Sequence, residues 1–257
     1  MISGREIREQ AREFGVPTST IERDYVQNWF LSALRPVNMA LKGGTGIRKV
    51  FIENYRFSDD LDFTLLEPVD TDTLRTAVID AMVRVRDESG IQFEDEIGFR
   101  QTKNGFKATT RFRILHRSPT SPIKIDLDMT SAVSEQILLP VSNRPVFHHY
   151  SDGLKTSVAS YAFEEIMAEK IRSIFQRNRS RDLYDIGQLA SRVDRDIVRS
   201  IVHRKCEYKG VTVDPAILQK KREQVAALWQ VSLGHQIHDI PDFDAVFETV
   251  MSVIEDL

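Results

Sequence analysis

Two aspartates one residue apart, preceded by a glycine turn, are the side chains in this sequence best suited to chemistry. Asp60 and Asp62 alternate with apolar residues over 58–65, which is typical of a strand with both carboxylates on one face. The strand rise places them about 7 Å apart, a spacing that suits divalent cations. Upstream, Gly43 and Gly44 would let the backbone approach a polyphosphate, and a helix starting there would offer free N–H groups. Together these residues predict a metal-dependent site for a nucleoside triphosphate.

A third carboxylate is expected from a neighbouring strand, because paired metal ions usually need one. The segment 123–129 predicts such a strand, with Asp126 and Asp128 on one face. Asp126 is the preferred third metal ligand and Asp128 is the alternative. Thr45 and Ser58 can donate hydroxyl hydrogen bonds to phosphate oxygens, or they can cap turns. An Asp-x-Asp pair alone is usually a solvated strand face, so the prediction depends on the conjunction of these motifs.

A lysine in the second half of the chain lies where the helical pattern is apolar. Lys170 falls inside the stripe of a helix expected over 163–175, so it must either extend to solvent or meet an anion such as a triphosphate. Asp182 and Asp185 are three residues apart and share a helix face. Asp182 suits a helix N-terminus. Asp185 is therefore the preferred functional acid, able to pair with Lys170 or an arginine or to accept a proton.

The elements that must position these residues divide the chain into two parts. The first 35 residues predict two helices, with a capping box at Ser19, and Asn104-Gly105 predicts a hairpin turn. Strands are also expected over 39–42 and 61–65, and a helix over 72–87. After residue 150 the spacing is helical over 163–175, 182–190, 194–205, 215–231 and 243–254. We therefore expect a mixed α/β domain over 1–150 and a helical domain over 151–257.

The composition is that of a folded protein with a substantial core. The chain has 257 residues, 41% of them hydrophobic, and a formal net charge of −3. Its single cysteine, Cys206, excludes an internal disulfide and fits a reducing compartment. His148 and His149 have no further zinc ligands nearby and are expected in a loop. The N-terminal residues contain no apolar signal core and no segment is apolar enough to span a membrane, so we expect a cytoplasmic protein without a membrane partner.

These motifs resemble those of the AbiEii/AbiGii-type nucleotidyltransferase toxins of bacterial toxin–antitoxin and phage-defence systems. The resemblance is carried by separate segments, namely residues 21–26, 41–49, 56–63, Lys170 and 181–185. Gly46 stands where that family's motif has an alanine. The resemblance implies α+β architecture, a polymerase-β-like nucleotidyltransferase core with a mixed sheet, followed by a helical domain that completes the active-site cleft.

The resemblance also implies cofactors and roles for individual residues. Mg²⁺, as one or two ions, would be held by Asp60 and Asp62, with an NTP as donor. Lys170 and Asp185 would complete the catalytic set from the second domain. The nucleotide-binding residues carried over are Gly43, Gly44, Thr45, Arg48, Lys49, Ser58 and Lys170.

The acceptor is indicated by charge and by the resemblance. Residues 165–225 contain 14 lysines and arginines against 9 aspartates and glutamates, which suits a phosphate-backbone partner, although a solvated helical surface has the same composition. The resemblance implies an RNA acceptor such as the tRNA 3′ end, and a cognate antitoxin. Two alternatives remain at this point: transfer to a protein or small-molecule hydroxyl, and a catalytically silent protein that acts by binding a partner.

Overall fold

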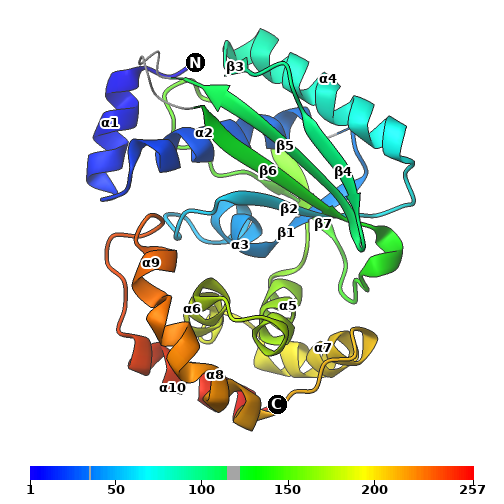
Figure 1. The fold of residues 1–257 in the computed structure, drawn as a ribbon, viewed down its shortest axis with the longest axis vertical. Helices are drawn as coiled ribbons and strands as arrows, with labels where there is room; N and C mark the ends of the chain where they lie inside the picture. The colour runs from blue at the N-terminus through cyan, green and yellow to red at the C-terminus, as the bar shows by residue number, and fades with distance from the viewer. Residues whose placement is uncertain (35, 115–121) are drawn as a thin grey trace. The chain divides into compact units, whose positions relative to one another are not determined.

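The computed structural model of the chain describes residues 1–34, 36–114 and 122–257 (Figure 1). They form two compact units: Met1–Glu135 with Val141–Ser160, and Gln136–Pro140 with Tyr161–Leu257. The chain leaves the first unit after Ser160, whereas the sequence indicates a boundary at residue 150. The reason is a pair of strands absent from the sequence interpretation, β7 (Ser142–Pro145) and β8 (Ser157–Ser160), of which β8 pairs parallel to β1 (Met39–Lys42).

Gln136–Pro140 belongs to the second unit because buried charges hold it there. The carboxylate of Glu165 accepts hydrogen bonds from the backbone N–H groups of Leu138 and Leu139, at 2.7 to 3.1 Å. The ammonium group of Lys205 donates to the carbonyl oxygen of Gln136 at 2.9 Å and lies 2.6 Å from Glu165. Both charged side chains are fully buried, so each depends on the other for charge compensation.

In the described residues, eight strands of the first unit form one mixed sheet in the order β3-β5-β6-β2-β1-β8-β7, with β4 paired to β5. The central pair, β2 and β6, runs parallel, and β5 and β6 run antiparallel. The mixed sheet confirms the expected fold class. The remaining strands are β2 (Asp60–Leu65), β3 (Gln92–Phe93), β4 (Gly98–Thr102), β5 (Gly105–Arg113) and β6 (Ile123–Thr130).

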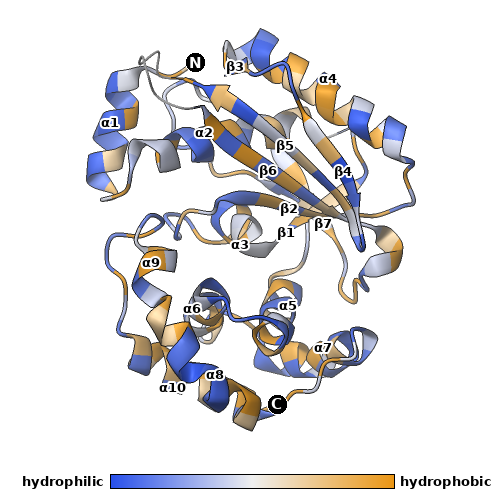
Figure 2. Ribbon diagram, viewed as in Figure 1, coloured by the Kyte–Doolittle hydropathy of each residue, from blue (hydrophilic) through white to orange (hydrophobic). Residues whose placement is uncertain are grey.

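One face of this sheet is packed and the other carries the charges. Leu61, Phe63 and Leu127 are fully buried and share a core with the helices α2 (Thr18–Ala33) and α4 (Thr71–Ser89). Figure 2 shows the alternation of hydrophobic and hydrophilic residues along β5 and β6 that produces this division. Because side chains alternate along a strand, Asp60 and Asp62 lie on the face opposite this core.

The other helices of the first unit are short or lie near the N-terminus. They are α1 (Gly4–Glu13), α3 (Gly43–Gly46), the π-helical turn η1 (Ile47–Phe51) that continues α3, and the 3₁₀ turn η2 (Ala132–Ser134). The predicted capping box at Ser19 is wrong. Helix α2 begins at Thr18 after Pro17, and the Thr20 N–H bonds to the Pro17 carbonyl oxygen at 2.9 Å, so the first turn forms without a side-chain cap.

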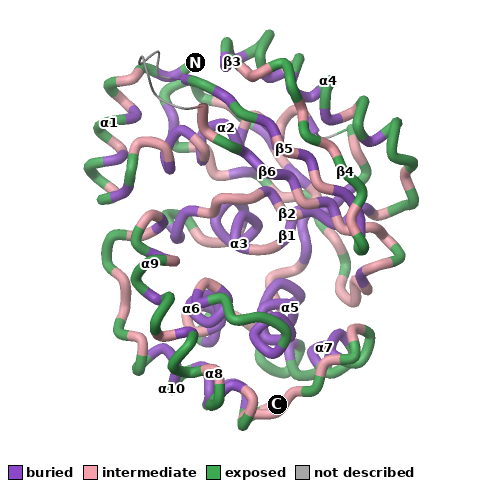
Figure 3. Tube along the Cα trace, in the orientation of Figure 1, coloured by how far each residue is buried: buried purple, intermediate pink, exposed green. Residues whose placement is uncertain are grey.

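The second unit is helical, as the sequence predicts. Its helices are α5 (Phe163–Gln176), α6 (Ser180–Leu189), α7 (Arg195–Tyr208), α8 (Pro215–Ala227), α9 (Trp229–Leu233) and α10 (Phe243–Glu255). Helix α5 packs against α6 and α7 and is buried along most of its length (Figure 3). The single helix expected over 215–231 is divided because the Leu228 N–H bonds to Val225, three residues back. In the part of the chain that the structure describes, no helix has the length and apolarity to cross a bilayer.

Candidate active site

The glycine turn lies directly against the aspartate strand. Gly43 has φ +69°, a left-handed conformation that glycine adopts without strain, and a Cβ placed there would lie 2.6 Å from Oδ2 of Asp62. A Cβ on Gly44 would lie 2.7 Å from Nη2 of Arg56. At each of these two positions a side chain would collide with a neighbouring charged group, which explains the presence of glycine. Any side chain at residue 43 would displace the carboxylate that the sequence assigns to metal binding.

Thr45 and Ser58 connect the turn to the strand. Thr45 is fully buried and its hydroxyl donates to the carbonyl oxygen of Asp60, so the proton expected to bind a phosphate is used inside the protein. Its role in this arrangement is to hold the turn on the first residue of β2. Ser58 is half-buried, and its carbonyl oxygen accepts from Nε2 of Gln27 at 3.0 Å. The Ser58 hydroxyl lies 3.3 Å from the position of a Cβ on Gly44, which places it beside the turn.

Four aspartates lie on the same face of two adjacent strands. In the β2–β6 register, Asp60 pairs with Asp126, and Asp62 pairs with Asp128. The backbone register thus places a carboxylate of the neighbouring strand beside each of these two aspartates, on the same side of the sheet. The side chains differ, because Asp62 faces the glycine turn whereas Asp126 faces cations from its own strand and from β5.

Asp126 is held by three neighbours. Its carboxylate lies 2.6 Å from Nζ of Lys124 and 3.3 Å from Nζ of Lys107, and it accepts a hydrogen bond from the Thr109 hydroxyl at 2.6 Å. Burial alone would raise the pKa of Asp126, but the hydrogen bonds from Lys124 and Thr109 and the charge of Lys107 lower it. Asp128 is more exposed and has Lys107 at 3.2 Å. Lys107 is thus shared between both carboxylates of β6.

The expected cluster of three metal-binding carboxylates is not formed. Among the residues that the structure describes, no three His, Cys, Asp or Glu side chains converge on a point where a metal ion would fit. Asp126 does not contribute to such a cluster because Lys107 and Lys124 already neutralise its carboxylate. The pair Asp60 and Asp62 still fits Mg²⁺, because this ion is usually bound through one or two carboxylates together with substrate phosphates and water. The absence of a side chain at Gly43 keeps the backbone of the turn directly beside the Asp62 carboxylate, which agrees with such a mixed ligand set.

Arg48 and Lys49, carried over as nucleotide-binding residues, are engaged elsewhere. The turn η1 directs both side chains toward α2, where Nε of Arg48 lies 2.6 Å and Nζ of Lys49 lies 2.7 Å from Oδ1 of Asp24. Tyr150 donates its hydroxyl to Oδ2 of the same carboxylate at 2.8 Å. All four side chains are buried. The carry-over is therefore corrected: these two cations neutralise a buried aspartate, and their positions do not leave them available to a nucleotide.

The pKa values in this cluster follow from burial and charge. Burial lowers the pKa of Lys49 to about 8, against the opposing effect of Asp24. Burial would raise the pKa of Asp24, but Arg48 and Lys49 together hold it well below its usual range. Asp24 lies in the segment 21–26 that carries the family resemblance without an assigned role. The sequence signal that could have identified Asp24 is the presence of an acidic residue on a helix beside the core residues Ile21 and Tyr25.

Two further cations beside the turn were missed by the sequence interpretation. Lys42, the last residue of β1, is in register with Asp62 and lies 3.8 Å from the carboxylate of Glu135. Arg56 packs its guanidinium against Gly44 and donates to the carbonyl oxygen of Phe57 at 3.0 Å. Both side chains are buried. The available signal was the charge of each residue next to an otherwise apolar strand or turn.

In the second unit, Lys170 meets two buried anions, one of the two options that the sequence leaves open. Its Nζ lies 2.9 Å from Asp182 and 2.7 Å from Asp185. Asp182 also accepts from Nε of Arg177 at 2.8 Å, so it does more than interact with a helix dipole. Burial would raise the pKa of Asp182, but Lys170 and Arg177 lower it strongly. Asp185 is fully buried, which leaves its carboxylate facing the ammonium group of Lys170.

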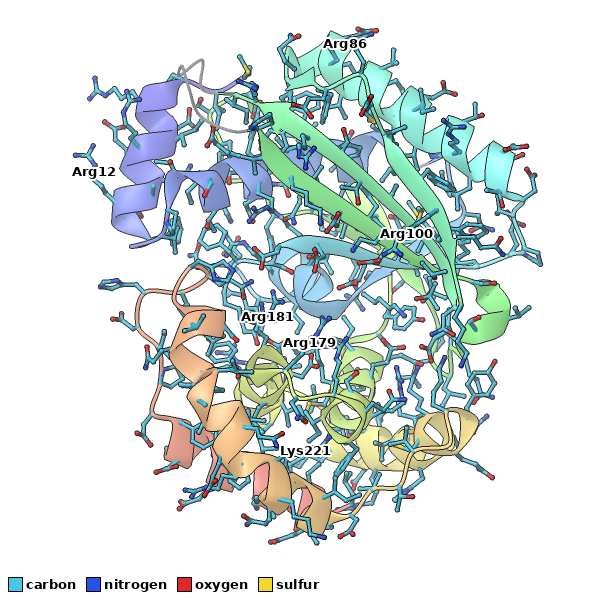
Figure 4. All side chains as sticks on the ribbon, viewed as in Figure 1. Arg12, Arg86, Arg100, Arg179, Arg181 and Lys221 are labelled. Carbon is cyan, nitrogen blue, oxygen red and sulfur yellow. The ribbon has the colours of Figure 1, made fainter. Side chains whose placement is uncertain are left out.

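The basic surplus of residues 165–225 is partly used inside the second unit. Lys205 is buried against Glu165 and Glu169, and Lys221 donates to the carbonyl oxygens of Ile174 and Phe175 at the end of α5. Other arginines of this region form exposed pairs, such as Arg222 with Asp244 at 2.7 Å. Figure 4 labels Arg179 just before α6, Arg181 on α6 and Lys221 on α8. The surplus therefore gives a weaker indication of a phosphate-backbone partner than the sequence count does.

Comparison with known proteins shows the family of the chain. A sequence profile of the family described as nucleotidyl transferase AbiEii toxin, type IV toxin–antitoxin system, matches residues 29–249. The chain belongs to this family. It is a nucleotidyltransferase toxin of a type IV toxin–antitoxin system, which confirms the resemblance and the enzymatic class and argues against a catalytically silent protein. By sequence, no curated protein matches the chain.

Solved structures show the same fold. MenT4, a nucleotidyltransferase toxin from Mycobacterium tuberculosis, superposes with a TM-score of 0.68 at 20% identity, over 100% of this chain and 91% of that chain. JHP933 from Helicobacter pylori has a TM-score of 0.59 at 16% identity, over 93% of this chain and 92% of that chain. A nucleotidyltransferase, described as putative, from H. pylori has a TM-score of 0.58 at 16% identity, covering 92% and 93% of the two chains. At these identities the likeness concerns the AbiEii-type fold alone.

Proposed function

We propose that this AbiEii family member transfers a nucleoside monophosphate from a Mg²⁺-bound NTP to an RNA acceptor such as the tRNA 3′ end. The observation that carries the proposal is the contact between the glycine turn and Asp62, next to Asp60 on the same strand face. A turn without side chains beside two carboxylates suits a triphosphate and its metal ion. In this proposal Asp60 and Asp62 hold the ion, and the backbone of residues 43–45 contacts the phosphates.

The chemistry asks the protein mainly for positioning and charge neutralisation. The acceptor hydroxyl oxygen forms a bond to the α-phosphorus, the bond from that phosphorus to the bridging oxygen of the β-phosphate breaks, and pyrophosphate leaves while the hydroxyl proton passes to water. Bound Mg²⁺ would supply neutralisation of the charge that develops on the phosphate oxygens. Asp60 and Asp62 orient the donor, and Thr45 keeps the turn at a fixed distance from β2 through its bond to the Asp60 carbonyl oxygen.

We further propose that transfer requires the Lys170–Asp185 pair of the second unit. A buried ion pair is expensive to desolvate and contributes little to stability compared with apolar packing, so its presence in the core of α5 and α6 supports a functional reason. Lys170→Met and Asp185→Asn are expected to lower the transfer rate by more than their lower folding stability explains. A cognate antitoxin, which the family description implies, is a further part of the proposal, and relief of toxicity by the co-expressed partner would test it.

The central experiment measures transfer from α-labelled ATP, CTP, GTP and UTP to total RNA, with Mg²⁺ or with EDTA. We expect a labelled band at tRNA size that EDTA abolishes and that Asp62→Asn lacks. Asp80→Asn, an exposed aspartate on α4, is the matched control and retains labelling. Labelled protein or a labelled small molecule in place of RNA would contradict the RNA acceptor while keeping the metal site. Full activity of Asp62→Asn would contradict the metal site itself.

A further inference from the structure

A group of cations occupies the same sheet face as the aspartates, on the side away from the glycine turn. Arg100 of β4 is in register with Lys107 of β5, and Lys107 is in register with Asp128 of β6. The next pair along β5 and β6 on this face beyond Thr109 and Asp126 is Arg111 with Lys124. Arg113 follows Arg111 two residues later on the same face. We call Arg100, Arg111 and Arg113 the outer arginines.

The outer arginines point away from the core. Phe112, which alternates with them along β5, is fully buried in the cluster shared with α2 and α4, whereas all three outer arginines are exposed. Figure 4 labels Arg100 on β4, and it labels Arg12 on α1 and Arg86 on α4. The outer arginines thus place three guanidinium groups on an exposed surface close to β2, where packing of the core does not require their charge.

Among the residues that the structure describes, few carboxylates lie close enough to neutralise the outer arginines. Arg111 lies 3.8 Å from Glu94, a long and half-exposed contact that contributes little. Arg100 and Arg113 form no ion pair with any other residue that the structure describes. By contrast, Lys107 and Lys124 are used to neutralise Asp126 and Asp128. The face thus changes from carboxylates on β2 and β6 to available guanidinium groups on β5 and β4.

The strand order places this change from carboxylates to guanidinium groups relative to the glycine turn. In the order β5-β6-β2-β1, the turn after β1 and the cations of β5 lie on opposite sides of Asp60 and Asp62. In-line transfer requires the attacking oxygen to approach opposite to the leaving pyrophosphate. If the glycine turn receives the phosphates of the donor, the acceptor must approach from the side of β6 and β5. The outer arginines lie along that path.

We infer that the outer arginines bind the phosphate backbone of a single-stranded polynucleotide whose terminal hydroxyl lies over β2. A guanidinium group matches a phosphate with two parallel hydrogen bonds, and a positively charged surface that follows the backbone is typical of single-strand binding. On β5, Arg111 and Arg113 flank the buried Phe112, so this stretch offers phosphate contacts in preference to stacking of bases. Binding is therefore sensitive to salt and tolerant of sequence. This inference depends on the RNA transfer proposed above.

The test uses the full chain with two matched triple variants. R100E/R111E/R113E reverses the outer arginines, and R12E/R75E/R86E reverses three exposed arginines on α1 and α4. Transfer is measured against RNA concentration and salt, and NTP affinity is measured separately. We expect the outer variant to raise the KM for RNA at least about tenfold and to reduce the slope of log affinity against log salt by about 2, from three lost contacts to a single strand. NTP affinity is unchanged, and the control behaves as wild type.

The outcomes separate this inference from the function on which it depends. Wild-type RNA labelling with an unchanged KM in the outer variant overturns the binding surface and leaves RNA transfer intact. Labelling of protein instead of RNA by the wild type overturns both. The R100Q/R111Q/R113Q variant removes the three charges without reversing them, and it keeps the test valid if the charge reversal causes a folding defect. It is expected to fold, to bind NTP normally and to show an intermediate increase in KM, and a wild-type KM in that variant also overturns the surface.

Discussion

Gly43 and Asp62 are in contact, with no space between the glycine backbone and the carboxylate for even one methyl group. This relationship joins the two motifs that the sequence presents as separate. It also makes the position of Asp62 depend on the absence of a side chain at Gly43, 19 positions earlier in the chain, which the antiparallel pairing of β1 and β2 brings close.

Gly43→Ala is expected to abolish transfer with a modest loss of stability. The added Cβ would lie 2.6 Å from Oδ2 of Asp62, and φ +69° adds strain of about 1–2 kcal/mol. Gly153→Ala is the control, because Gly153 has φ +67° and nothing within 4 Å of a new Cβ. Both variants should lose similar stability in urea unfolding, and Gly43→Ala alone should lose transfer. Equal transfer rates in the two variants would contradict a steric role for Gly43.

Lys49→Met is expected to lower stability without changing NTP affinity. Removing one partner of a buried ion pair costs about 3 kcal/mol, although Arg48 and Tyr150 still bind Asp24. Thermal unfolding measures the first effect, and titration with a non-hydrolysable NTP below the unfolding transition measures the second. Lys155→Met, at an exposed lysine, should change neither. A folded Lys49→Met protein with weakened NTP binding would return Lys49 to the nucleotide site.

Acid should unfold the protein partly through Asp182. The pKa of Asp182 is lower in the folded chain than in the unfolded chain, because Lys170 and Arg177 outweigh the effect of burial. Fewer protons are then bound in the folded state, so this group stabilises the fold above about pH 4 and loses that contribution as the pH falls. Asp182→Asn should lower the free energy of unfolding at pH 7 and make its decline between pH 5 and 3 shallower. Asp239→Asn, at a highly exposed carboxylate, should reproduce the wild-type slope.

Asp126 and Asp128 should differ when each is changed to asparagine. Asp126 is buried and neutralises Lys107 and Lys124, so Asp126→Asn is expected to cost about 1–3 kcal/mol of stability and to reduce transfer through the disturbed lysines. Asp128 is exposed enough for water to replace its pair, so Asp128→Asn should lower transfer less than about threefold. Urea unfolding and transfer rates measure both effects. A complete loss of transfer in Asp128→Asn with unchanged stability would instead identify Asp128 as a metal ligand.

The local elements could be predicted because their signals are local. The alternation of Asp60 and Asp62 with Leu61 and Phe63 predicts β2 and its faces, and the spacing of the apolar residues predicts α5. The hairpin at Asn104 forms as its turn residues indicate. The short strands β7 and β8 could not be predicted, because four residues carry too little periodicity and their pairing comes from neighbours remote in sequence.

The sequence determined which strand carries Asp60 and Asp62, whereas the partners of each charged side chain were decided by the tertiary structure. Periodicity specifies which face a residue occupies, and so the sequence places Asp60, Asp62, Asp126 and Asp128 on one side. It does not specify which counter-charge comes within hydrogen-bonding distance. Strand order brings Lys107 to Asp126, and the turn η1 brings Lys49 to Asp24, because burial of any charge requires a partner and long-range packing decides which one is near.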